Sequence, residues 1–179
     1  SETVAKLQQK LNSVTIGDAS NQATDIGPLV SEKQRVLLQE QFNDAIKKGA
    51  VVTYTKEIPA NLHGFFHSPI ILTKVTKDMR VWNEEVFGPI LPIVSFTSEE
   101  EAIVLANDTQ YGLGGYVFTE DKTRFARVAS AVNTGLIMMN NGSYVAPPTP
   151  FGGCKRSGIG REHGKYGFHD LAVIKVIST

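Results

Sequence analysis

Apolar and polar residues alternate along the chain in two periods, which predict helices and strands in turn. Helical spacing predicts helices over residues 2–11, 31–48, 98–107 and 122–132. Runs of β-branched and aromatic residues predict strands over 51–55, 70–74, 90–96, 115–119, 135–140 and 171–177. Because strands and helices alternate through the middle of the chain, we predict an α/β protein with a mainly parallel open sheet and flanking helices.

Two of the predicted helices begin with a capping box. Ser31 is followed three residues later by Gln34, and the same spacing recurs at residues 98–101. In such a box the hydroxyl group and the longer side chain satisfy the first free N–H groups of the helix. After Ser31 the spacing predicts an apolar face made of Val36, Leu37, Phe42, Ala45 and Ile46.

The end of the chain has two features that differ from this alternation. Residues 141–162 contain seven glycines or prolines before Ile159, which predicts a long irregular loop, and such loops are usually functional. The last predicted strand, 171–177, is apolar on both faces apart from Lys175. A strand of this kind needs cover on both faces, so it is a candidate for pairing across a subunit boundary.

Composition narrows the class of protein. The 179 residues include 18 Lys plus Arg and 18 Asp plus Glu, and a zero net charge argues against a general nucleic-acid surface. One cysteine cannot form an internal disulfide, so a reducing, cytoplasmic setting is predicted. The longest apolar stretch, 86–96, contains Gly88, Pro89 and Pro92 and is far shorter than the roughly 20 residues of a membrane helix. The chain begins without Met and inside a helical pattern, which we interpret as a fragment of a longer protein.

Residues 83–90, Asn-Glu-Glu-Val-Phe-Gly-Pro-Ile, are the most distinctive stretch of the chain. Pro89 lacks an N–H group, and Gly88 tolerates backbone angles that other residues avoid. These two residues predict a firm turn that presents Glu85 and Phe87 outward. The alternative is that Glu85 is a solvated turn residue and that Phe87 anchors the core.

Two motifs resemble the aldehyde dehydrogenase family. Residues 84–89, Glu-Glu-Val-Phe-Gly-Pro, look like one signature of that family, and residues 150–162, Pro-Phe-Gly-Gly-Cys-Lys-Arg-Ser-Gly-Ile-Gly-Arg-Glu, look like its segment near the carboxyl end. The resemblance covers essentially the whole chain. It implies NAD or NADP as cofactor and oxidation of an aldehyde to an acid through a cysteine thiohemiacetal and thioester. It also implies that residues 1–162 are a catalytic-domain portion and that 163–179 hold an oligomerisation strand, hence a homo-oligomer.

The resemblance implies roles for four residues. Glu85 would hold the nicotinamide ribose, since a carboxylate offers two acceptor oxygens to two hydroxyl donors, and Phe87 would pack beside the nicotinamide ring. Phe151 would help to line the aldehyde tunnel. Succinate-semialdehyde dehydrogenases, the nearest nameable subfamily, commonly carry a serine in the loop before Phe-Gly-Gly. Loop length places the apolar Val145 there, so a less polar aldehyde stays open as substrate.

No catalytic residue is assigned to the chain. In the family the nucleophilic cysteine, the base and the oxyanion amide lie upstream of the matched segment, so this chain alone is predicted to be inactive. Cys154 has cationic neighbours, as a reactive thiol would need. The family position varies and is not the nucleophile, so we predict that Cys154 is not catalytic.

Metal sites and phosphate loops are not predicted. His63 and His67 have i, i+4 spacing, but Gly64 and Pro69 argue against a helix that would bring them together. The glycines of residues 158–164 follow a loop rather than a strand, unlike a dinucleotide phosphate loop.

Two other functions remain open. The chain could be a non-catalytic module that acts in subunit association, or part of a related reductase of acyl phosphates or acyl thioesters. Upstream sequence would separate them, and the choice between NAD and NADP lies there too.

Overall fold

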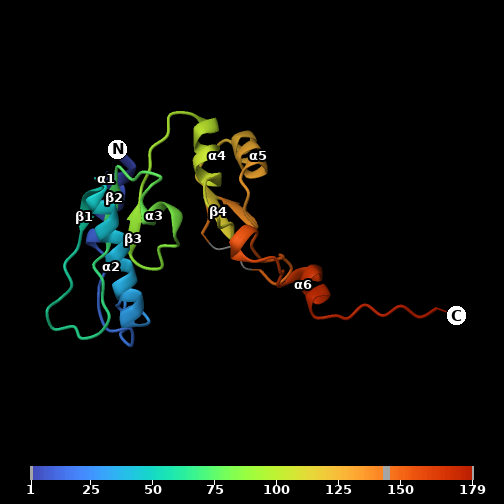
Figure 1. The fold of residues 1–179 in the computed structure, drawn as a ribbon, viewed down its shortest axis with the longest axis horizontal. Coiled ribbons are helices and arrows are strands. Elements are labelled where there is room, and N and C mark those ends of the chain that lie inside the picture. Colours follow the sequence, from blue (N-terminus) through green and yellow to red (C-terminus); the bar gives the residue numbers. More distant parts are fainter. Residues whose placement is uncertain (1, 143–145, 179) are drawn as a thin grey trace. The chain divides into compact units, whose positions relative to one another are not determined.

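The computed structural model describes residues 2–142 and 146–178, and these form two compact units, residues 1–95 and 96–179 (blue to green and yellow-green to red in Figure 1). The boundary predicted at residue 162 is a different one, because it separates a catalytic-domain portion from a segment with an oligomerisation strand. That boundary stays a prediction.

The first unit is a small three-stranded sheet covered by helices. Its elements are α1 (Glu2–Asn12), α2 (Glu32–Lys47), β1 (Val51–Thr55), β2 (Ile70–Thr73), α3 (Arg80–Asn83) and β3 (Ile90–Pro92). The strand order is β1-β2-β3, in which β1 runs antiparallel and β3 parallel to the central β2. The short α3 was not predicted.

Helix α2 packs on this sheet through a face that differs from the predicted one. Its fully buried residues are Leu38, Gln41 and Ala45, whereas Val36 is 42% and Ile46 39% exposed. The apolar face predicted from Val36, Leu37, Phe42, Ala45 and Ile46 is therefore wrong in most of its members. The buried face differs from the predicted one because it includes a polar residue. Gln41 lies in the middle of that face and donates hydrogen bonds to Glu84 and to the carbonyl oxygen of Glu85.

The second unit contains a parallel βαβ arrangement. Its elements are α4 (Glu99–Asn107), β4 (Gly114–Val117), α5 (Lys122–Ala131), β5 (Leu136–Met139), the short 3-10 helix η1 (Lys155–Ser157) and α6 (Gly164–Asp170). Strands β4 and β5 are parallel, with Gly114 opposite Leu136, and α5 connects them. The predicted α/β class with parallel pairing and flanking helices is confirmed.

The glycine-rich loop of the second unit, residues 152–158, packs against the residues that immediately precede β4 and β5. The carbonyl oxygen of Gly112 accepts the backbone N–H groups of Gly135 (3.0 Å) and Cys154 (2.9 Å), and the N–H group of Gly112 donates to Ser157 Oγ (3.0 Å). A Cβ atom on Gly135 would overlap the backbone of Gly152. Two backbones in direct contact thus fix the start of the loop.

Residues 172–178 form an extended segment that pairs with no strand of the described part of the chain (Figure 1). Its apolar residues are almost fully exposed, at 87% for Leu171, 95% for Val173 and 91% for Ile174. The strand predicted over 171–177 is thus absent from the single chain. The reason is physical: a strand exists through hydrogen bonds to a neighbour, and no described residue supplies them.

Candidate functional site

Residues 84–88 form an extended segment that links α3 to β3. Successive side chains of an extended backbone point to opposite sides. Val86 packs against the core of the first unit, whereas Glu85 is exposed and Phe87 is 65% exposed. Glu85 and Phe87 therefore lie on the outer side, as predicted, and the alternative in which Phe87 anchors the core is wrong.

One stripe of α2 holds this segment from beneath. Gln34 Nε2 donates to the carbonyl oxygen of Phe87 (3.0 Å), and Gln41 Nε2 donates to the carbonyl oxygen of Glu85 (3.1 Å). Leu38, which lies between them on the same helical face, contacts Gly88 so closely that a Cβ atom there would overlap its side chain. Positions i, i+4 and i+7 of one helix thus fix three points of the segment.

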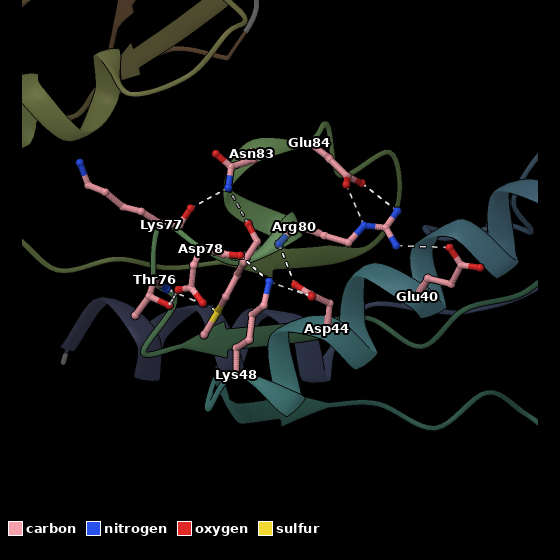
Figure 2. Close-up of polar contacts among 10 residues, drawn as sticks. Glu40, Asp44, Lys48, Thr76, Lys77, Asp78, Arg80, Asn83 and Glu84 are labelled. Carbon is pink, nitrogen blue, oxygen red and sulfur yellow. Dashed lines mark hydrogen bonds and ion pairs between the residues drawn. The ribbon is translucent and has the colours of Figure 1, made fainter.

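An ion pair fixes the other end of the segment (Figure 2). Arg80 holds Glu84 through two hydrogen bonds, Nε to Oε1 at 2.7 Å and Nη2 to Oε2 at 3.0 Å, and its Nη1 lies 3.3 Å from Glu40 Oε2. The hydrogen bond from Arg80 is the main reason that the pKa of Glu84 lies below its usual value. A planar guanidinium with two parallel bonds also sets the direction of the carboxylate.

The same network ties α3 to α2. The backbone N–H of Arg80 donates to Asp44 Oδ2 (2.8 Å), and Asp44 also pairs with Lys48 (2.9 Å). Lys48 in turn donates to the carbonyl oxygen of Asp78. Figure 2 shows the side chains of Asp44 and Lys48 directed at the backbone of Arg80 and Asp78. The pKa of Asp44 is lowered, chiefly by the hydrogen bond from the backbone of Arg80.

The carboxylate of Glu85 differs from that of its neighbour Glu84. No described residue donates a hydrogen bond to it or forms an ion pair with it, while its backbone carbonyl is held by Gln41. The result is a fixed backbone that presents two free acceptor oxygens next to an exposed aromatic ring. This donor and acceptor chemistry fits a diol attached to a flat ring system.

Phe151 belongs to the second unit. It forms an isolated antiparallel bridge with Glu162, in which each backbone N–H donates to the other carbonyl (2.8 and 2.7 Å). The bridge borders a hollow of about 760 Å³ whose lining residues include Leu113, Pro147, Phe151, Arg161, Phe168 and Leu171. Val145, the other predicted substrate residue, lies outside the described residues.

The glycine-rich motif after Phe151 is organised around Arg161. Arg161 Nη1 donates to the carbonyl oxygens of Gly153 (2.7 Å) and Gly160 (2.8 Å), and its backbone N–H donates to Asp170 (2.8 Å). The guanidinium is thus used within the loop to hold backbone carbonyls.

Cys154 is part of the same packing. Its Sγ lies 3.4 Å from the carbonyl oxygens of both Gly112 and Asn133. The ammonium group of the adjacent Lys155 is held by the carbonyl oxygens of Asn107 (3.2 Å) and Thr109 (3.0 Å). The neighbouring cation therefore serves the backbone rather than the thiol.

His67, which could in principle ligate a metal, is a buried residue of the first unit. His67 is 7% exposed, its Nδ1 lies 2.8 Å from the carbonyl oxygen of Ser68, and burial lowers its pKa. Within residues 2–142 and 146–178 no group of three or more His, Cys, Asp or Glu residues is arranged to hold a metal ion. Among the helices of those same ranges, none combines the length and apolar character required to cross a membrane.

The parallel strand pairs and flanking helices define an α/β protein, which is a broad class. Comparison with known proteins makes the assignment specific. The model of the aldehyde dehydrogenase family matches residues 1–177. The chain therefore belongs to the aldehyde dehydrogenase family.

The chain is similar to several characterised types of aldehyde dehydrogenase. It is 42% identical over 98% of its length to a succinate-semialdehyde dehydrogenase [NADP(+)] of Deinococcus radiodurans, and covers 37% of that protein. It is 38% identical over 99% of its length to an aminoaldehyde dehydrogenase of Pisum sativum, and covers 35% of it. The chain thus spans about a third of the length of these curated relatives.

Solved structures show the same fold. A Mycobacterium tuberculosis aldehyde dehydrogenase in complex with NAD+ matches with a TM-score of 0.89 and 37% identity, over 95% of this chain and 35% of that one. An Escherichia coli NADP-dependent enzyme matches with a TM-score of 0.87 and 39% identity, over 93% of this chain and 34% of that one.

The sequence analysis did not predict the residues that hold the extended segment 84–88. Gln41 and Arg80 lie 44 and 5 positions before Glu85, and neither belongs to a motif. One signal was available for Gln41: it shares helical spacing with Leu38 and Ala45, so a polar residue stands within an apolar stripe.

The Glu84–Arg80 pair predicts a pH dependence. Because the folded-state pKa of Glu84 lies below the usual 4.5, the pair contributes stability above that pH, and the contribution is lost as the pH falls through the folded value. Glu84→Gln should therefore lower the urea unfolding midpoint at about pH 7, and this difference from the natural chain should shrink below about pH 4.5.

The matched control is Glu57→Gln, which changes an exposed carboxylate of the same unit that makes no hydrogen bond or ion pair with a described residue. It should leave the midpoint unchanged at both ends of the range. A Glu84→Gln difference that stays constant with pH would contradict the assigned pair.

Proposed function

We propose that this chain is the part of an NAD(P)-dependent aldehyde dehydrogenase that clamps the nicotinamide ribose and lines part of the aldehyde site. The observation that carries the proposal is the free carboxylate of Glu85 beside the exposed ring of Phe87, on a segment whose backbone is fixed from beneath by α2.

The chemistry of the segment suits that role. The two oxygens of Glu85 can each accept a hydrogen bond from one ribose hydroxyl, and hydrogen bonds to an ionised acceptor are stronger than those to a neutral one. Phe87 offers a flat apolar surface to the attached pyridine ring. When bound, NAD(P) supplies the hydride acceptor of the reaction. The choice between NAD and NADP stays open, since relatives of both kinds match the chain.

The residues that perform covalent chemistry lie outside this chain in our proposal. Its one cysteine, Cys154, is engaged with backbone carbonyls, and we assign it to packing. We therefore propose that the chain is the C-terminal portion of a longer, cytoplasmic enzyme, which would supply the thiolate, the base and most of the dinucleotide site.

The substrate is proposed from the second unit and the relatives. Phe151, at the edge of a hollow, would contact the aldehyde, together with the loop that holds Val145. The relatives' names include succinate-semialdehyde and aminoaldehyde dehydrogenases, so the substrate proposed is an aldehyde. The apolar Val145 leaves a less polar aldehyde open as an alternative.

We expect the 179-residue chain alone to be inactive because it lacks the thiolate that attacks the aldehyde. Mixed with aldehyde and NAD(P), it should produce no reduced cofactor, as followed by absorbance, whereas the complete natural protein that contains the chain should. Turnover by the isolated chain would overturn the proposal, and a complete protein that works only on acyl phosphates or acyl thioesters would favour the reductase alternative.

Glu85→Gln in the complete natural protein should weaken NAD(P) binding by roughly tenfold or more, because charge-assisted hydrogen bonds to the ribose become neutral ones. Calorimetric titration measures this directly. Glu57→Gln is the charge-matched control, and Phe151→Ala the opposite case, expected to change the KM for aldehyde and not the affinity for the cofactor. An unchanged affinity in Glu85→Gln would disprove the ribose clamp.

We also propose that the apolar end of the chain pairs with another copy in a homo-oligomer. The exposed side chains of residues 171–177 alternate between two faces. From Val173 on, the extended backbone makes no backbone hydrogen bond with a described residue, so it is a template for strand addition.

In the complete protein, removal of residues 171–179 should therefore reduce the molar mass measured by light scattering to that of a smaller assembly. Hydrogen exchange on the amides of residues 171–177 should be slow in the intact protein, since pairing protects them. Val173→Lys, which keeps the length, should act in the same direction. A monomeric intact protein with fast exchange in this segment would rule out the pairing.

A further inference from the structure

We propose that Gln41 is a positioning residue for cofactor binding: its buried side-chain amide sets the direction of the peptide that carries the Glu85 carboxylate. This inference rests on the proposed function of Glu85. It adds a residue from α2, far from the motif in sequence, to the machinery that binds the ribose.

The geometry of Gln41 is specific. The side chain is 1% exposed, and its Nε2 donates one hydrogen to Glu84 Oε2 (3.0 Å) and the other to the carbonyl oxygen of Glu85 (3.1 Å). An amide nitrogen has two hydrogens, so both are used. The reversed amide orientation would place an oxygen against two acceptors, so the donor assignment follows from the surroundings.

The two acceptors differ in what else supports them. The carboxylate of Glu84 is also held by two bonds from Arg80, so it keeps its place without Gln41. Among the described residues, Gln41 is the donor that holds the carbonyl of Glu85. Loss of the Gln41 amide would therefore free the Glu85 peptide to rotate. This rotation would turn the Glu85 carboxylate away from the direction in which it meets the ribose hydroxyls.

Stability alone gives a poor account of this amide. Gln41 Oε1 is buried and accepts no hydrogen bond from a described side chain or backbone group. A buried acceptor without a partner offsets much of what the two donated bonds contribute to folding. Gln41→Met, which has similar length and removes both donors and the acceptor, should therefore still fold.

The test is a double-mutant cycle in the complete natural protein, read by calorimetric NAD(P) binding and by steady-state kinetics. Gln41→Met should weaken cofactor binding about threefold to tenfold, the size expected for one neutral hydrogen bond. Added to Glu85→Gln, the same substitution should weaken binding less than about twofold, because Gln41 acts through Glu85. The KM for NAD(P) should rise while the KM for aldehyde stays constant.

A readout independent of activity is hydrogen exchange of the Val86 and Phe87 amides in the protein without cofactor, which should be faster in Gln41→Met. The matched control is Gln39→Met on the same helix. Gln39 donates to Asn43 (3.0 Å) and does not touch the loop, so binding and exchange should be unchanged.

The outcomes separate this inference from the proposed function. If Glu85→Gln weakens binding and Gln41→Met does not, or weakens it equally in both backgrounds, Gln41 does not position Glu85 and the inference is wrong while the clamp stands. If Glu85→Gln has no effect, the clamp itself is wrong and the inference falls with it.

Discussion

The contact between one face of α2 and the segment that leads into β3 is the constraint on which the candidate site depends. A glycine–proline segment has few hydrogen bonds of its own, and its shape must come from elsewhere. Here two amide side chains hold backbone carbonyls while a leucine fills the space left by Gly88. Val86 faces the core on one side, which leaves the other side to present functional groups.

Much of the fold could be predicted from local patterns, because local signals determined it. The capping serines 31 and 98 accept the predicted backbone N–H groups, and the first predicted strand has the observed bounds Val51–Thr55. The failures involve tertiary interactions. The buried face of α2 contains Gln41, which an apolar pattern cannot include, and the segment predicted as a strand at 171–177 has no strand partner among residues 2–142 and 146–178. Helices α3 and α6 are too short to show a period.

The candidate site also has a part that local sequence patterns predict and a part that depends on tertiary interactions. The motif predicts that Glu85 and Phe87 face outward, and both are exposed while Val86 between them packs against the core. The residues that support them come from α2 and α3, at sequence separations that no local pattern reveals. Cys154 shows the converse: adjacent cations suggested reactivity, and only the observed path of Lys155 toward backbone carbonyls shows where that charge is used.

The bare end of the chain has a consequence for its behaviour in solution. Five large apolar side chains stand in water there, Leu171, Val173, Ile174, Val176 and Ile177. Positive and negative groups are equal in number and the isoelectric point is about 6.9, so near neutral pH there is little long-range repulsion between molecules. The separate polypeptide should thus aggregate most readily in neutral buffers. It should be more soluble at a pH well away from the isoelectric point.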